Sequence, residues 1–432
     1  MENMIGIRQA VRKILAKLEI SDYYLLLEDQ IAIARERWGG NTKRSAFHLL
    51  VWNLKVLLKH HFHAEEICRP RKFRGSEDAQ TVTVLARLCG GVGDKLIVLN
   101  YLYLVRSNYQ GPAPMEIDVV ISSGEDVARA IAQKGSIFRN VFPEFGGDTA
   151  EYDVYLDSTG RYLKLRGWDE ERVTCLLPLF AQYLKECMAF EERFKPVFVQ
   201  APCFDALAPA ITAFSGKRKR ICQPDFNGAL GIGDSFRYPP FLPENGREYL
   251  ASLGLEAGNY ITLHRGCDTY YKGNVVKMWP VEHYSRLLTL LKQEYPGVTI
   301  VQMGVSETRF PQMAGCDVYT VGKTTMDQVK VLLRYSALHI DCEGGYVHLR
   351  QWLGGGTSVV LFGPTSSDFY GYEHNINIQG QGCPQPCEWL TRDWAVRCPR
   401  GFACPPCMSS ITPETVMDQI RTHAGILTKA VR

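Results

Sequence analysis

Apolar and polar positions alternate with two different periods along the chain. Short apolar runs of strand length, "TVTVLARLC", "EIDVVIS" and "YDVYLD", occupy residues 81–89, 116–122 and 152–157, and the segments between them are long enough for helices. The stretch from Trp168 to Phe194 has the pattern of one long helix. Strands that alternate with helices predict a parallel sheet with helices on both faces.

A stretch rich in Gly and Pro interrupts this alternation. "GIGDSFRYPPFLPENG", residues 231–246, is typical of a linker. After it the strand-like runs "NYITLHRG", "VTIVQMG", "ALHIDC", "TSVVLFG" and "NINIQ" alternate with helices expected at 280–295, at 326–335 and near Val347. The pattern therefore predicts an α/β protein with two facing Rossmann-like parallel-sheet domains.

The expected domain bounds follow from these changes of pattern. Residues 1–75 have a helical pattern and form an N-terminal extension, residues 76–235 the first Rossmann-like domain, and residues 236–432 the second. The segment "HHFH" at 60–63 could bind a metal ion, but no carboxylate or Cys is spaced to complete a site. A solvated end of a helix is the simpler interpretation.

Length, composition and charge narrow the class of protein. A chain of 432 residues is too long for one core of ordinary size, and 46% hydrophobic with 22% charged residues is typical of a globular protein. The net charge of +3 gives no reason to expect nucleic acid or a membrane surface as partner. The N-terminus does not resemble a signal peptide, and no apolar run is long enough to span a bilayer, so we expect a cytoplasmic protein.

The first glycine-rich turn follows the strand-like run at 81–89. Gly90, Gly91 and Gly93 precede Asp94 in "RLCGGVGDKL", and a helix is expected to begin there. A dinucleotide fingerprint would need a third glycine where Leu96 stands. Asp94 is therefore either a helix cap or a carboxylate at the edge of a cleft that can accept a proton.

A second turn of this kind, "DCEGGYVHL", follows the run "ALHIDC". Glu343, Gly344 and Gly345 form the turn, and ligands of open parallel sheets bind beyond such carboxyl ends. Two backbone N–H groups at a helix start suit a pyrophosphate, and the acid beside them suits sugar hydroxyls. The alternatives are a tight turn with a solvated Glu343, and a core role for His348.

Two further strand ends carry candidate ligands. Lys277 stands just before the "WP" of a helix start and can reach a phosphate, although a solvated surface charge is the simpler interpretation for a lone Lys. Gly304 ends the run "VTIVQMG", and Glu307 follows it as a candidate ribose ligand.

Five of the 14 cysteines crowd into one segment, residues 383–407. Their spacing is Cys383-x3-Cys387-x10-Cys398-x5-Cys404-x2-Cys407. Under reducing conditions such a cluster favours metal binding over disulfides. Structural iron or zinc would be held by the two close pairs, Cys383 with Cys387 and Cys404 with Cys407. Cys398 would then not be a ligand.

The rival for this segment is a zinc ribbon that touches nucleic acid. Its contact residues would be Trp389, Trp394 and Arg400. The better interpretation is that this segment stabilises a long loop between the last strand and the last helix and binds no nucleic acid.

Together, these motifs resemble the heptosyltransferase family of glycosyltransferases (family nine), whose fold is GT-B. The family's first domain opens with a strand and a "GD" turn, here Gly93–Asp94, and its second carries acid–small–Gly–x–x–His–Leu, here Glu343–Leu349, followed by "FGP" at 362–364. The usual acid is Asp, so Glu343 is a departure. "EGGYVHL" with the cysteine tail is similar to the autotransporter heptosyltransferases, which modify proteins and carry a four-cysteine iron finger.

The resemblance implies roles for the candidate residues. Asp94 would be the general base, Lys277 would neutralise the donor phosphates, Glu307 would hold the nucleotide ribose, and Glu343 would contact the donor sugar. The pyrophosphate would lie on Gly344–Gly345, and the resemblance implies no catalytic metal.

The implied reaction is inverting transfer of heptose from a nucleotide diphosphate heptose, ADP-heptose, to an acceptor hydroxyl. The acceptor would be a protein or a glycan, and a homo-oligomer is compatible with the family. The alternatives are a lipopolysaccharide or capsule glycosyltransferase of the same fold, and a non-catalytic nucleotide-sugar binding protein that would not need Asp94.

Overall fold

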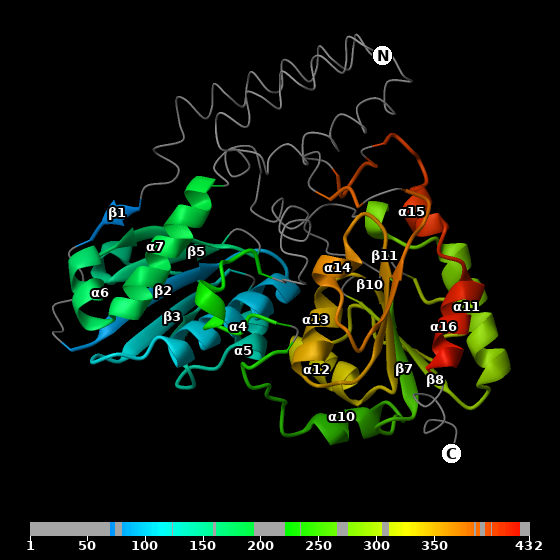
Figure 1. Cartoon of the computed structure of the whole chain (residues 1–432). Helices are drawn as coiled ribbons and strands as arrows, with labels where there is room; N and C mark the ends of the chain where they lie inside the picture. The colour runs from blue at the N-terminus through cyan, green and yellow to red at the C-terminus, as the bar shows by residue number, and fades with distance from the viewer. Residues whose placement is uncertain are drawn as a thin grey trace, which may run out of the picture.

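The computed structural model describes residues 70–73, 80–122, 124–158, 161–193, 221–233, 235–265, 275–304, 311–383, 386–388, 394–398 and 400–423. Within them the chain forms two six-stranded sheets that lie side by side, each with its own helices (Figure 1). The strands of the first sheet are β1 (Arg71–Lys72), β2 (Val82–Leu88), β3 (Met115–Ile121), β4 (Phe138–Phe142), β5 (Val154–Ser158) and β6 (Leu163–Trp168). Those of the second are β7 (Tyr260–His264), β8 (Thr299–Met303), β9 (Val318–Tyr319), β10 (Leu338–Cys342), β11 (Ser358–Phe362) and β12 (Ile376–Gln379).

The helices fall into two groups along the chain. Those that go with the first sheet are α4 (Val92–Asn108), α5 (Glu125–Ile131), α6 (Glu170–Leu176) and α7 (Pro178–Arg193). Those that go with the second are α10 (Gly246–Ser252), α11 (Val281–Glu294), α12 (Met326–Tyr335), α13 (Gly345–Trp352), α14 (Ser367–Tyr370), α15 (Pro406–Ser409) and α16 (Pro413–Thr422). Short 3-10 turns lie at Thr149–Glu151, Phe226–Gly228 and Val275–Lys277.

The first sheet is mostly parallel, with the order β1-β6-β5-β2-β3-β4. β2 pairs in parallel with β3 and β5, but β5 and β6 form an antiparallel hairpin, which the alternation pattern did not predict. The prediction of one helix from Trp168 to Phe194 is wrong as well. The helix breaks at Leu177, whose φ of −136° is non-helical, because the next residue is a proline and disfavours helical geometry in its predecessor.

The second sheet has the order β12-β11-β10-β7-β8-β9, and all of its pairs are parallel, as predicted. Its strands β10 and β11 are buried along their whole length, and β10 carries His339 and Asp341 among its apolar residues. Helix α12 begins with a capping box, in which the Thr325 side chain accepts from the Gln328 N–H and the Gln328 side chain accepts from the Thr325 N–H. All parallel strands of the sheet end at one edge, and β7 and β10 place their carboxyl ends there side by side.

The two sheet units contact each other through their helices. Figure 1 shows α4 and α5 facing α13 and α12 at the centre of the molecule. One apolar cluster continues across this contact, and polar groups cross it too: the Met326 N–H donates to the Asp126 carboxylate at 3.0 Å, and the Lys330 ammonium donates to the Ala130 carbonyl at 2.9 Å. The carboxyl ends of β2 and β10 are thereby brought to the same interface.

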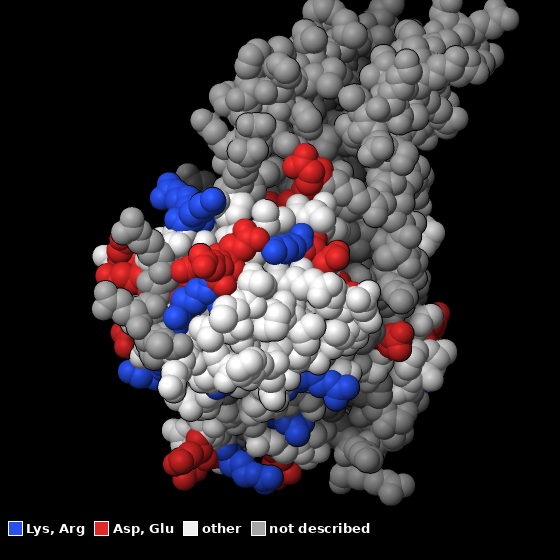
Figure 2. Space-filling view, turned by 60° about the vertical axis from the view of Figure 1, so that its left-hand side comes forward, with Lys and Arg blue, Asp and Glu red and all other residues white. Residues whose placement is uncertain are grey.

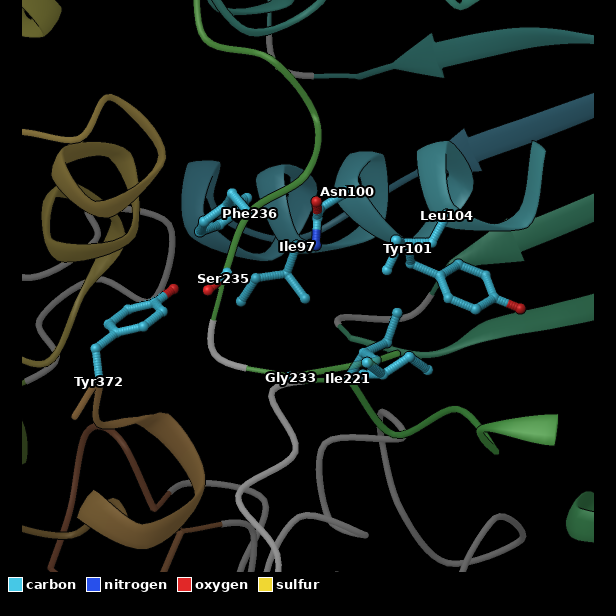
Figure 3. Close-up of a pocket in the computed structure, with 10 residues that line it drawn as sticks. Ile97, Asn100, Tyr101, Leu104, Ile221, Gly233, Ser235, Phe236 and Tyr372 are labelled. Atoms are coloured by element: carbon cyan, nitrogen blue, oxygen red, sulfur yellow. The ribbon is translucent and has the colours of Figure 1, made fainter. Parts of the chain in front are cut away.

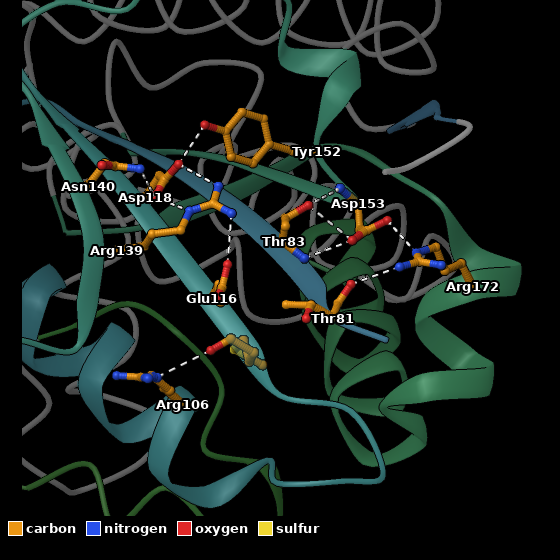
Figure 4. A network of polar contacts seen from close by, with 11 residues as sticks. Thr81, Thr83, Arg106, Glu116, Asp118, Arg139, Asn140, Tyr152, Asp153 and Arg172 are labelled. Atoms are coloured by element: carbon orange, nitrogen blue, oxygen red, sulfur yellow. Dashed lines mark hydrogen bonds and ion pairs between the residues drawn. The ribbon is translucent and has the colours of Figure 1, made fainter. Parts of the chain in front are cut away.

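Away from the interface between the two sheet units, buried polar groups hold the strands of the first sheet in register. Figure 4 shows Asp153, which accepts from the Thr83 backbone at 2.7 Å and from the Arg172 guanidinium at 2.8 Å. Asp118 likewise pairs with Arg139 at 2.7 Å and accepts from the Tyr152 hydroxyl. Each of these acids has its charge neutralised and its oxygens satisfied, so we assign them to the stability of the sheet.

The outer side of the first sheet unit carries charges of both signs. In Figure 2, basic and acidic side chains are interspersed around a large uncharged area, and the described residues of this face form no continuous basic surface. Among the residues that the structure describes, no helix combines the length and apolar character needed to cross a bilayer.

Most of the predicted N-terminal extension lies outside the described residues, including the "HHFH" segment. Where the two overlap, the prediction of helix is wrong, because Arg71–Lys72 is a strand that pairs with β6.

Candidate active site

Asp94 lies at the third position of α4, directly after the glycine turn that leaves β2. Its Oδ2 accepts from the Gly91 N–H at 2.9 Å, which caps the helix. Its Oδ1 accepts from the Arg161 Nε at 2.7 Å, in an ion pair that leaves the Asp94 side chain 23% exposed. Gly90 has a φ of +90°, and a Cβ there would lie 2.9 Å from the Asp94 carboxylate, so glycine is needed. Asp94 is therefore a helix cap and an ion-pair partner at once.

Arg161 is the residue that sequence reasoning missed. It follows the end of β5 in the hairpin to β6, its side chain is only 4% exposed, and it lies at the contact between the two sheet units. Besides Asp94, its guanidinium reaches His348 Nε2 at 2.9 Å and Glu343 Oε1 at 3.6 Å. The ring of Tyr370 lies 4.3 Å from the guanidinium carbon. The Arg161 guanidinium thus contacts both predicted glycine turns, through Asp94 in one and Glu343 in the other.

Glu343 is buried between two cations. Its Oε2 pairs with the Lys277 ammonium at 2.5 Å, and its Oε1 lies 3.6 Å from Arg161. Burial opposes ionisation of this acid, but the Lys277 charge, with that of Arg161, outweighs it and holds the pKa of Glu343 well below its ordinary value. Glu343 is therefore a carboxylate, as the sugar-binding hypothesis requires, and Lys277 has an anionic partner already.

The protonation state of His348 follows from its neighbours. A guanidinium can only donate, so His348 Nε2 accepts from Arg161, and the proton of the neutral ring is on Nδ1, 2.7 Å from the Tyr372 hydroxyl. Burial and the nearby Arg161 charge lower the pKa of His348 to about 4. His348 is thus a neutral, buried ring at physiological pH, which combines the core role with a contact to the site.

The two glycine turns pack directly on each other. A Cβ on Gly93 would lie 2.5 Å from His348 Cδ2 and 3.2 Å from the Gly345 Cα, and a Cβ on Gly345 would lie 3.4 Å from the Gly93 nitrogen. The first turns of α4 and α13 therefore meet, and their positive dipole ends converge on the charged cluster Asp94–Arg161–Glu343–Lys277. This arrangement brings the candidate base and the candidate donor site together, as the sequence predicted.

The other predicted donor contacts are less complete. Gly304 ends β8, where a Cβ would lie 3.5 Å from the His264 ring, and Glu307 falls outside the described residues. The structure adds His264, whose Nδ1 lies 2.9 Å from Asp341 Oδ1 and whose ring packs on Tyr346. Both His264 and Asp341 stand at carboxyl ends of strands, a signal that was visible in the sequence.

A small pocket lies beside α4, on the face that carries Asp94 (Figure 3). Ile97, Tyr101 and Leu104 follow Asp94 at helical spacing and line it. Tyr372, which is hydrogen-bonded to His348, lines another side of this pocket. The described residues that line it are uncharged: Ile97, Asn100, Tyr101, Leu104, Ile221, Ile232, Gly233, Ser235, Phe236 and Tyr372.

The cysteines of the segment at 383–407 differ in burial. Cys387, Cys398 and Cys407 are buried and Cys383 is half-buried, whereas Cys404 is exposed. Burial first, and neighbouring thiols second, raise the pKa of Cys383, Cys387 and Cys407, the last to about 12, and Cys398 contributes to all three. Cys398 thus lies buried near the other three cysteines, whereas Cys404 is exposed.

The donor chemistry of this cluster suits a thiolate-binding metal ion, although its thiols do not form a finished site. Among the described residues, no three or more metal-ligating side chains come together in a geometry that would hold an ion. The predicted metal finger is thus not confirmed.

No protein-family model matches the chain, and no curated protein matches it. Solved structures do. The iron-containing dodecameric glycosyltransferase TibC from enterotoxigenic E. coli is 13% identical over 84% of this chain and 81% of that chain, with a TM-score of 0.50. The ADP-heptose lipopolysaccharide heptosyltransferase II of E. coli is 16% identical over 81% of this chain and 99% of that chain, with a TM-score of 0.47. The likeness to TibC shows the fold, an α/β architecture of two mostly parallel sheets of the GT-B kind.

Proposed function

We propose that this protein is an inverting glycosyltransferase that transfers heptose from ADP-heptose to an acceptor hydroxyl. The observation that carries the proposal is the meeting of two turns from different sheets, one with Asp94 and one with Glu343, Gly344 and Gly345, around Arg161 and Lys277. The sequence motifs of the heptosyltransferase family lie in these two turns. The fold, which resembles that of TibC, supports the same class.

The proposed reaction is a single displacement. The acceptor oxygen attacks the anomeric carbon of the donor sugar while the bond from that carbon to the β-phosphate oxygen breaks, so ADP leaves with the bonding electron pair. The acceptor's proton passes to Asp94. Lys277 and the backbone N–H groups at Gly344–Gly345 stabilise the negative charge that develops on the leaving diphosphate, and Glu343 orients the sugar hydroxyls.

We propose a protein as the acceptor and the first sheet unit, residues 76–235, as the acceptor domain, with donor binding in residues 236–432. The resemblance of "EGGYVHL" and the cysteine tail to the autotransporter heptosyltransferases, which modify proteins, supports a polypeptide acceptor. The described cysteines are free thiols, which fits the reducing cytoplasm as the proposed location.

For the cysteine cluster we propose one structural iron ion, by analogy with TibC, whose structure is described as iron-containing. Cys383, Cys387, Cys398 and Cys407 would hold it as thiolates. Bound iron would supply a cross-link between β12 and α16, and the raised pKa values of the thiols mean that this cation, once bound, must displace their protons.

Mass spectrometry tests the proposed function. The purified protein is incubated with ADP-heptose and, separately, with protein acceptors and with lipopolysaccharide cores, and we expect a heptosyl gain on a protein. Asp94→Asn should abolish the gain, while the exposed Asp148→Asn, a control of the same chemistry in the same sheet unit, should retain it. Release of free heptose alone, or no change in any acceptor, would contradict the proposal.

A second candidate function has an observation in its favour. Both oxygens of Asp94 already have protein partners, as expected if Asp94 is only a cap in a non-catalytic nucleotide-sugar binding protein. Such a protein would bind ADP-heptose without transfer, and Asp94→Asn would leave its function unchanged. The same incubation, combined with calorimetry of ADP-heptose binding, separates the two.

A further inference from the structure

The charged cluster at the interface consists of two cation–carboxylate pairs, and the closeness of these pairs leads to an inference about Arg161. The first pair is Arg161 with Asp94 at 2.7 Å, and the second is Lys277 with Glu343 at 2.5 Å. Arg161 also lies 3.6 Å from Glu343, a distance at which it has no direct hydrogen bond. Asp94 is therefore the tight partner of Arg161.

This pairing conflicts with the proposed role of Asp94. Burial tends to raise its pKa, but the Arg161 charge and hydrogen bond, with the Gly91 N–H, lower the pKa of Asp94 below its ordinary value. A carboxylate held in this way is ionised but accepts a proton poorly, because a general base works best when its pKa is near the working pH. Both of its oxygens are also engaged. For Asp94 to accept the proton of the acceptor, its contact with Arg161 must loosen.

The donor itself supplies the group that can loosen this contact. The two oxygens of the single Glu343 carboxylate face Arg161 and Lys277, so the two cations are separated by no more than one carboxyl group and its contacts. A diphosphate held by Lys277 and the turn at Gly344–Gly345 would therefore lie next to Arg161. It carries more charge than a carboxylate and offers several oxygens to the planar fork of a guanidinium.

We propose that Arg161 is shared between Asp94 and the donor: it holds the Asp94 carboxylate in the ligand-free protein and turns to the diphosphate when the nucleotide binds, which releases Asp94 to act as base. Arg161 is thus a positioning residue for Asp94 and a ligand of the leaving group. Donor binding therefore precedes deprotonation of the acceptor, because Asp94 is free to act as base only when the donor is present. This inference rests on the proposed function, because it assumes a nucleotide diphosphate at Lys277.

Calorimetry with ADP and adenosine tests the inference without relying on activity. Arg161→Gln should weaken ADP binding by roughly 10- to 100-fold, the contribution of hydrogen bonds to a charged group, and should leave adenosine binding unchanged. Arg161→Lys should recover part of the loss, because it keeps the charge without the fork. Arg166→Gln is the matched control, since Arg166 lies nearby in β6 but pairs with Asp157.

The decisive variant is Asp94→Asn. If Arg161 is shared, removing its competing carboxylate should tighten ADP binding several-fold, although the variant is expected to lose transfer. Part of any tightening comes from the lost negative charge alone, so Asp94→Asn is also measured in the Arg161→Gln background, where the tightening should be much smaller. Equal effects of Asp94→Asn in the two backgrounds would overturn the inference.

The possible failures are distinguishable. A parent protein that does not bind ADP contradicts the proposed function, and the inference falls with it. A parent that binds ADP, with an Asp94→Asn variant that binds it no more tightly, contradicts only the sharing of Arg161. If Arg161→Gln does not fold, as judged by loss of adenosine binding, Asp94→Asn is measured in the Arg161→Lys background instead, where loss of the guanidinium fork should reduce the tightening, and equal tightening in the two backgrounds would overturn the inference.

Discussion

His348 predicts how the stability of this protein depends on pH. Its ring is 1% exposed and neutral, Arg161 donates to Nε2, and Nδ1 lies against the Tyr372 hydroxyl. Protonation in the folded state would place a charge in a buried position and a second cation 2.9 Å from the guanidinium, and for these two reasons the pKa of His348 falls to about 4. In the unfolded chain the ring has its ordinary pKa of 6.5.

The sign and the size of the effect follow from linkage. Between pH 6.5 and about 4 the unfolded chain binds a proton at this position and the folded chain does not, so stability is lost as the pH falls through that window. One pKa unit corresponds to about 1.4 kcal/mol, so the full loss from His348 is about 3 kcal/mol, most of it reached by pH 4.5. Burial keeps solvent screening of this value small.

Urea unfolding at pH 7.5, 5.5 and 4.5 measures the loss in the parent and in His348→Gln. The variant should be less stable at pH 7.5, by about 1–3 kcal/mol, because it loses hydrogen bonds. It should also lose less on acidification, by about 3 kcal/mol, than the parent does. The pKa of the buried His339 is also lowered, but His339 is present in both proteins, so its contribution cancels in the difference between them.

The control is His423→Gln, which removes an exposed histidine at the end of α16 and should leave the pH dependence as in the parent. If the parent and His348→Gln lose the same stability between pH 7.5 and 4.5, His348 is not the buried neutral group that the structure describes, and the argument for its tautomer is refuted.

Three further predictions concern the other parts of the site. Gly93→Ala should lower stability by about 1–3 kcal/mol in thermal unfolding, because its Cβ would meet His348 and push α4 from α13, while Gly146→Ala, with open space around it, should change little. Lys277→Ala should weaken ADP binding in calorimetry by about tenfold or more and spare adenosine; equal loss of both ligands would indicate general damage. Elemental analysis should give about one iron per chain, lost in Cys398→Ser and kept in Cys404→Ser; the reverse would restore the pairing of Cys404 with Cys407.

Much of the fold could be predicted because its signals are local. The buried runs at β2, β3, β10 and β11 are mostly apolar over the length of a strand, and the linker at 231–246 is marked by Gly and Pro. The hairpin of β5 and β6 was not predicted, because parallel and antiparallel strands have the same two-residue alternation of side chains and the apolar pattern does not distinguish them. The break at Leu177 was available in the sequence, as Pro178 follows it.

The candidate site divides in the same way. Asp94 and the turn at Glu343–Gly345 could be found because glycines next to an acid at a strand end are a compact pattern. Cys398 was set aside because spacing favours close pairs, whereas the fold buries Cys398 and exposes Cys404. Nothing near Arg161 in the sequence indicates a role.

The sequence by itself determined the two strand–helix alternations, the turns that end β2 and β10, and therefore which residues stand at the carboxyl ends of the strands. Only the tertiary structure decided which charges meet. Arg161 is 67 positions from Asp94 and 187 from His348, and it reaches both because the hairpin of the first sheet unit ends where α4 and α13 pack together. Hydrophobic period and turn chemistry act over a few residues, whereas an ion pair depends on distances that the packing of whole sheets sets.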